Sequence, residues 1–154
     1  MGRLVELRAE PSDTEVAEHL LSQFEAEIAA RYQGWDLSQG PSATPDDLSP
    51  AGGCFLVAYL DGEPAGCGGL KRLDATSAEI KRLYVAPAAR GHGTARALLG
   101  ALETAAAERG YERVRLDTGD RLPEAVSLFR SAGYVEIADY NGNPYAAFWF
   151  EKRL

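Results

Sequence analysis

The segment RGHGTARALLGALETAAAERG, residues 90–110, places two glycines directly before an amphipathic helix. The apolar side of this helix consists of Ala95, Leu98, Leu99, Leu102 and Ala106. Glycine is among the weakest helix formers, so a glycine pair at a helix start indicates a backbone that must leave room for something. The N–H groups of a first helical turn are unpaired and carry partial positive charge. They bind an anion when the backbone can be approached closely.

Two interpretations of these glycines are open. In the first, the backbone amides from Arg90 to Ala95 surround a pyrophosphate, and Arg90 and Arg96 add positive charge. In the second, Gly91 and Gly93 only make a tight turn from a strand into a helix. No Walker lysine follows, and no ribose-binding acid stands where a dinucleotide-binding unit needs one. The glycines alone are therefore a weak signal for either of these nucleotide-binding motifs.

The remaining elements follow from hydrophobic periodicity. Helical spacing of Val16, Leu20, Phe24 and Ile28 predicts a helix behind a cap at Ser12 or Asp13. The dipeptide Asp61-Gly62 predicts a tight hairpin turn. Strands are predicted at 4–7, 54–60, 64–73, 77–87, 111–119, 134–140 and 146–154, and a last helix at 122–133. This order predicts an α/β fold with a mixed, mostly antiparallel central sheet flanked by helices.

Length and composition limit the class of protein. A chain of 154 residues, 45% of them hydrophobic, predicts one domain over residues 1–154. The formal charge of −7 argues against a nucleic-acid partner. Cys54 and Cys67 lie in predicted strands, which favours buried thiols over a disulfide, and His19 and His92 lie in different elements, so no metal site is expected. No signal core or membrane-length apolar run is present, which predicts a cytoplasmic protein without a membrane partner.

The run EIKRLYVAPAARGHGTARALLGALE, residues 79–103, resembles the acetyl-CoA-binding core of the GNAT superfamily of N-acetyltransferases. Arg90, Gly93 and Ala95 match its Arg/Gln-x-x-Gly-x-Gly/Ala signature. The later run LDTGDRLPEAVSLFRSAGY resembles the next strand and helix of that family, so the match covers about residues 54–137. The resemblance implies an enzyme, monomeric or homodimeric, that moves an acetyl group from acetyl-CoA to an amine of a small molecule or of a peptide or protein.

The resemblance also assigns residues to the cofactor. The pyrophosphate loop would be Arg90, Gly91, His92, Gly93, Thr94, Ala95 and Arg96. Leu83, Tyr84 and Val85 would pair their backbone with the pantetheine arm, and the helix with Ser127 and Phe129 would line the other side. Two positions depart from the pattern: Leu122 replaces a common Asn, and Phe129 replaces a Tyr that serves as general acid. Binding of the cofactor should survive both changes, but the proton donor is left open.

Acetyl transfer to an amine requires a base for the ammonium proton, and Glu79 stands where some family members place a catalytic Glu. The alternative is a surface charge paired with Lys81 or Arg82. Tyr140 and Tyr145 are candidate acids, or only parts of a surface turn.

Two residues are predicted on the acceptor side of the site: Asn143 in the turn that holds both tyrosines, and Trp35 at the start of the long loop 34–53, whose alternative is plain disorder. Phe129 keeps a second function open, namely a CoA-binding sensor or regulatory module with the same fold and no turnover.

Overall fold

The structure is a computed structural model that describes residues 5–32, 34, 42–50 and 52–154. The predicted substrate residue Trp35 lies outside the described residues. The elements follow the predicted order: β1 (Val5–Ala9), α1 (Glu15–Arg31), β2 (Cys54–Leu60), β3 (Glu63–Arg72), β4 (Ser77–Val85), the 3₁₀ turn η2 (Pro87–Ala89), α2 (Thr94–Glu108), β5 (Arg113–Thr118), α3 (Pro123–Ser131), β6 (Val135–Ile137) and β7 (Phe148–Arg153).

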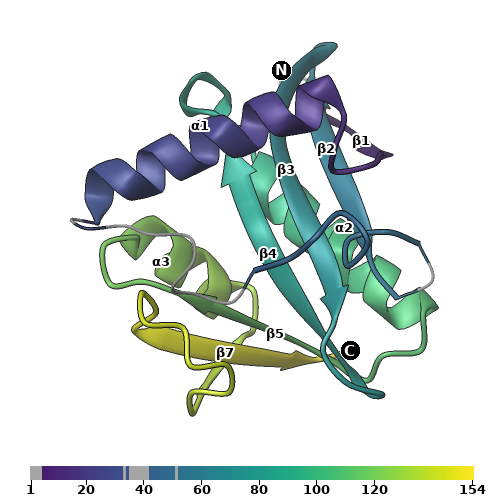
Figure 1. The fold of residues 1–154 in the computed structure, drawn as a ribbon, viewed down its shortest axis with the longest axis vertical. Helices are drawn as coiled ribbons and strands as arrows, with labels where there is room; N and C mark the ends of the chain where they lie inside the picture. Colours follow the sequence, from purple (N-terminus) through teal and green to yellow (C-terminus); the bar gives the residue numbers. More distant parts are fainter. Residues whose placement is uncertain (1–4, 33, 35–41, 51) are drawn as a thin grey trace.

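The described strands form one seven-stranded sheet in the order β1-β2-β3-β4-β5-β7-β6 (Figure 1). Neighbouring strands are antiparallel except for β4 and β5, which run parallel. The mixed, mostly antiparallel α/β fold is therefore confirmed. The parallel pairing covers only 77–79 of β4 and 113–115 of β5. Beyond it the two strands diverge, and no described strand pairs with the rest of β4 on that edge.

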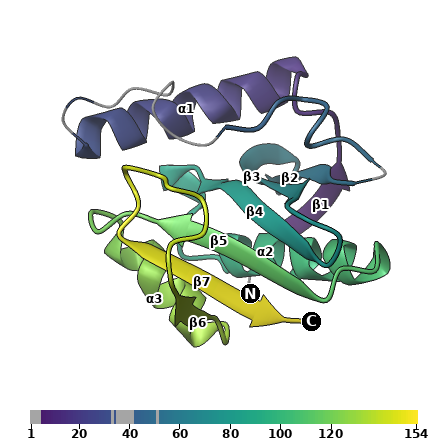
Figure 2. The same cartoon turned by 60° about the horizontal axis from the view of Figure 1, so that its bottom comes forward.

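Helices cover both faces of the sheet (Figure 2). On one face α1 buries Ala17 and Leu20 against Phe55, Val57 and other residues of β2–β4. On the other face α2 and α3 pack over a larger core, which includes Leu99, Leu102, Val114, Phe129 and Phe150. Alternating burial in the strands and apolar stripes on the helices therefore meet in two layers, as the periodicity predicts.

Local signals in the sequence mostly placed the turns correctly. Asp61 and Gly62 both have positive φ, at 52° and 85°, as the predicted hairpin turn requires. The predicted cap of α1 was wrong: the cap is Thr14, whose side chain accepts a hydrogen bond from the Ala17 N–H, whereas Ser12 is buried two residues earlier. Ser, Thr and Asp all cap helices well, so composition could not choose among them.

A bulge interrupts β4 at Arg82, whose φ is +58°. The register with β3 shifts at this point, because Tyr84 pairs with Cys67 whereas Lys81 pairs with Gly69. Before the bulge Ile80 faces the core under α2, and after it Leu83 packs against that same core while Tyr84 faces α1. An extra residue in a strand moves every later side chain to the opposite face, and that shift is observed here.

Both cysteines are free and buried, as predicted. Burial raises the pKa of the Cys54 thiol, and it raises that of Cys67 to about 12. The described residues contain no cluster of His, Cys, Asp and Glu that could hold a metal ion. None of the described helices combines the length and the apolar character that a membrane span requires.

Candidate functional site

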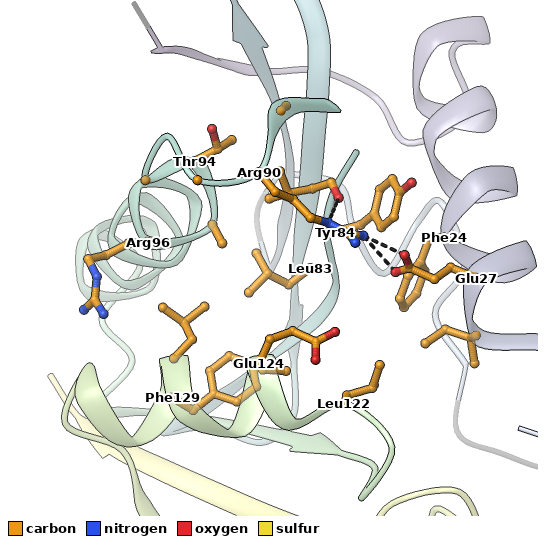
Figure 3. A pocket seen from close by; sticks show the side chains of 18 residues that line it. Phe24, Glu27, Leu83, Tyr84, Arg90, Thr94, Arg96, Leu122, Glu124 and Phe129 are labelled. Carbon is orange, nitrogen blue, oxygen red and sulfur yellow. Dashed lines mark hydrogen bonds and ion pairs between the residues drawn. The ribbon is translucent and has the colours of Figure 1, made fainter. Parts of the chain in front are cut away.

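A pocket of about 380 Å³ opens where β4 and β5 diverge, between α1, the loop before α2, and α3 (Figure 3). Its walls are mostly apolar. They consist of Phe24, Glu27 and Ile28 on α1, Leu83, Tyr84 and Val85 on β4, Ala89, Arg90, Gly91, Gly93, Thr94, Ala95 and Arg96 around the start of α2, and Leu122, Glu124, Ala125, Leu128 and Phe129 on α3. We call it the first pocket.

The start of α2 gives this pocket an anion-binding end. Gly93 is the N-cap with φ +76°, Gly91 has φ +86°, and a Cβ at either glycine would meet no atom within 4 Å. Within the described residues, no protein group accepts a hydrogen bond from the N–H groups of Thr94, Ala95 and Arg96. The buried Thr94 hydroxyl also has no hydrogen-bond partner in the described part of the chain. Open space, free amides and a helix N-terminus together fit a phosphate group.

The two arginines of this loop are directed elsewhere. The Arg90 guanidinium donates to both carboxylate oxygens of Glu27 on α1, at 2.7 and 2.9 Å, and to the Val85 carbonyl at 3.0 Å (Figure 3). Arg96 donates to the Ser131 hydroxyl at 2.6 Å. Arg90 therefore joins the loop to α1, and the free groups at the pocket end are backbone amides.

A second pocket of about 210 Å³ adjoins the first. The two pockets share a wall, made of Phe24, Ile28, Leu83, Leu122, Ala125 and Phe129. The second pocket is also lined by charged and polar residues that do not line the first. These are Glu79, Lys81 and Arg82 of β4, Asp117 of β5, and Tyr32, Ser42, Asn143 and Tyr145. A ligand in the first pocket would therefore reach a polar chamber at its far end.

Glu79 is 2% exposed and accepts three hydrogen bonds. Its Oε1 accepts from Lys81 Nζ at 3.2 Å. Its Oε2 accepts from the Tyr140 hydroxyl at 2.6 Å and from Asn141 Nδ2 at 3.1 Å. A buried carboxylate without such donors would be very unfavourable, so the three donors fix its position beside the second pocket.

Asn141 connects Glu79 to a second carboxylate. Its amide also donates to Asp117 Oδ2, and its carbonyl oxygen accepts from the Trp149 indole at 2.9 Å. The other oxygen of Asp117 accepts from Asn143 Nδ2 at 3.1 Å. Burial raises the pKa of Asp117, while the two amide donors act in the opposite direction. The turn 139–145 thus holds two carboxylates of neighbouring strands at one wall.

Most predicted site residues meet in these pockets, but not all. The first pocket includes every predicted cofactor residue except His92 and Ser127, which are exposed and line neither pocket. Asn143 and Tyr145 line the second pocket with Glu79. Tyr140 does not line it, because its hydroxyl is turned to Glu79. Burial, and next the Glu79 charge, raise the pKa of Tyr140 far above its ordinary value.

Sequence reasoning missed three side chains of the site: Asp117, Glu27 and Asn141. A signal existed for Asp117, since it stands at the carboxyl end of a strand, where parallel neighbours bring polar groups together. Glu27 and Asn141 gave no such signal. Their partners are 63 and 62 residues away in the chain, so only tertiary structure brings them together.

Comparisons with known proteins bear on the family and the fold. An N-acetyltransferase of Bacillus subtilis, YsnE, whose function is uncharacterized, is 37% identical over 103 residues, which are 64% of this chain and 68% of that one. A solved structure of an acyl-CoA N-acyltransferase from Klebsiella pneumoniae is similar over 98% of both chains, with a TM-score of 0.78 and 26% identity. A GNAT family acetyltransferase from Elizabethkingia anophelis, solved with acetyl-CoA bound, has the same fold. Its TM-score is 0.67 and its identity 17%, over 97% of this chain and 98% of that one.

The family match itself spans residues 14–134 and thus includes α1, the β4 bulge, the glycine loop and α3. It is the Acetyltransferase (GNAT) family. Because the match covers well over half of the sequence, and the divergent β4 and β5 strands and the helix start lie inside it, the chain belongs to the GNAT family of N-acetyltransferases.

Proposed function

We propose that this protein transfers an acetyl group from acetyl-CoA to the amine of a small molecule or a peptide. The observation that carries the proposal is that the two pockets adjoin, with free helix amides at the first and the buried Glu79 carboxylate at the second. The Elizabethkingia relative with acetyl-CoA bound supports the choice of cofactor.

The residues of the first pocket fit CoA as a ligand. The amides of Thr94, Ala95 and Arg96 would hold its pyrophosphate, since the glycines leave the approach open. The apolar wall from Phe24 to Phe129 would surround the pantetheine arm and exclude water. When bound, acetyl-CoA supplies an acetyl thioester, which reacts with a neutral amine.

The residues of the second pocket supply the proton chemistry. Glu79 would take the proton from the acceptor ammonium, directly or through one water. Lys81, Tyr140 and Asn141 hold the Glu79 carboxylate in one orientation, as a positioned base requires. Phe129 has no proton to give, so Tyr145, which lines this pocket and whose hydroxyl donates to the Gly34 carbonyl at 3.2 Å, is our candidate for the proton donor.

The alternative, a CoA-binding sensor without turnover, has less support. A sensor needs the first pocket alone, whereas this chain also buries Glu79 with three donors around it. Buried polar groups are costly and are usually retained for a reason.

We expect acetyl-CoA to raise the melting temperature of the protein. We also expect that, when a panel of amines is added with acetyl-CoA, the enzyme releases the free thiol of CoA. A ligand that binds only the folded state stabilises the protein, so protection alone would fit both enzyme and sensor. Thiol release separates them. The protein's own thiols are buried with raised pKa values, so a thiol reagent should report CoA with little background. Protection without thiol release for any amine would favour the sensor.

Replacing Tyr140 by Phe should lower turnover by about tenfold and leave the alkaline limb of the pH profile in place. Because its pKa is raised, Tyr140 stays protonated throughout pH 6–9 and its ionisation cannot produce the alkaline limb, so its loss should act through the orientation of Glu79. Turnover against pH for this variant and for Tyr145→Phe measures the difference. Loss of the alkaline limb in Tyr140→Phe alone would make Tyr140 the donor.

A further inference from the structure

We propose that the acceptor is a small amine that also carries a carboxylate, such as a free amino acid, and that Arg82 binds this carboxylate while Glu79 faces the amine. This inference rests on the proposed acetyl transfer and concerns the occupant of the second pocket.

Arg82 is a charged residue of the second pocket that has no ion-pair partner among the described carboxylates. Lys81 is paired with Glu79 at 3.2 Å, so these two charges compensate each other. Among the described residues, no carboxylate lies within ion-pair distance of Arg82. Within the described residues, the Arg82 side chain makes one hydrogen bond, from Nη2 to the Ala43 carbonyl at 2.8 Å. The other N–H groups of the guanidinium are available, and their planar fork matches a carboxylate.

The backbone does not explain an arginine at this position. With φ at +58°, residue 82 adopts a left-handed conformation, for which Gly is best suited and Asn or Asp next. A long side chain there is strained by about 1–2 kcal/mol. Gly, Asn or Asp would adopt this conformation more readily. The backbone therefore does not account for arginine here, and the reason for it lies in the guanidinium group. Strain of this kind is typical of functional sites.

Another part of the chamber is suited to an amine. Glu79 and Asp117 lie there, joined through the Asn141 amide. The second pocket therefore presents a cation from the bulge that no described carboxylate pairs, and two carboxylates, one near the start of β4 and one near the end of β5. That distribution is complementary to a zwitterion. A volume of about 210 Å³ fits a small molecule better than a folded protein surface.

The test compares the standard amino acids with their carboxamides, each with acetyl-CoA, by thiol release. We expect wild-type kcat/KM to favour the best amino acid over its amide by about tenfold to a hundredfold, the usual effect of a charged hydrogen-bonding pair. In Arg82→Gln this preference should fall to near one, through a higher KM. Arg82→Lys keeps the charge without the fork and should recover part of the preference.

Lys71→Gln is the matched control. Lys71 donates to the carbonyl of Ser42 at 3.0 Å, next to the Ala43 carbonyl that Arg82 contacts, but it does not line the pocket. Loss of a contact to this loop is thus common to both variants, and the preference should change only in Arg82→Gln. If Arg82→Gln does not fold, inhibition of the wild type by simple carboxylic acids, competitive with the acceptor, replaces it.

The outcomes separate the two proposals. Thiol release from amines with no preference for a carboxylate, or an unchanged preference in Arg82→Gln, overturns the role of Arg82 and leaves acetyl transfer intact. Absence of thiol release with every amine, acidic or not, overturns the proposed function itself.

Discussion

Glu79→Gln should lower kcat by about 10²–10⁴-fold, the usual contribution of a general base. The amide is nearly the same size and can still accept from Tyr140, so the pocket keeps its shape, but it can no longer take a proton. Affinity for acetyl-CoA should stay near the wild-type value, because Glu79 does not line the first pocket. The deficit should shrink as the pH rises, since more of the acceptor amine is then already neutral. Steady-state kinetics from pH 6 to 9, with calorimetry for the cofactor, measure both effects.

Glu103→Gln is a close control for this substitution. Glu103 on α2 also accepts from a tyrosine and a lysine, Tyr134 at 2.8 Å and Lys152 at 2.9 Å, but it lines neither pocket. Its replacement should reduce stability and leave kcat unchanged. Equal turnover in wild type and Glu79→Gln at every pH would mean that Glu79 is only a buried structural charge.

Gly93→Glu should weaken acetyl-CoA binding by roughly 10²–10³-fold. Two like charges about 4 Å apart repel by about 4 kcal/mol at an effective dielectric constant of 20, and the new carboxylate would stand at the free amides of α2. The new side chain has room, because a Cβ at Gly93 meets no atom within 4 Å. Its positive φ will cost about 1–2 kcal/mol of folding stability. Calorimetric titration with acetyl-CoA measures the binding.

Gly110→Glu separates strain from binding. Gly110 has φ +85° and the same open surroundings, but it lies just past the other end of α2. Both variants should lose similar stability, and only Gly93→Glu should lose affinity. Near-native affinity in a folded Gly93→Glu protein would remove the helix start from the cofactor site.

The sequence predicted the order of the elements because its local signals agreed with one another. Apolar stripes, the Asp61-Gly62 turn and Pro123 at the first position of α3 each depend on a few neighbouring residues. The glycine loop was predicted for the same reason, since positive φ at Gly91 and Gly93 is a property of glycine itself.

The parts that the sequence did not predict depend on distant contacts. Arg82 bears no local sign of a left-handed backbone, and a strand read by simple alternation hides the shift at that position. Asn141 looked like a turn former and is one, but its amide also joins two carboxylates from other strands. Such roles arise from tertiary geometry, on which pattern and propensity carry no information.

The bulge in β4 has a consequence for how such a protein can diversify. Residues 79–82 line the second pocket, and Tyr84 and Val85 line the first, with Leu83 shared between them. The two halves of one strand thus line different pockets, and the change of face at Arg82 separates the two halves. Mutations in the earlier half can explore new chemistry in one chamber while the later half keeps its contacts in the other. The extra residue at the β4 bulge thus allows substitutions at one pocket to leave the side chains at the other unchanged.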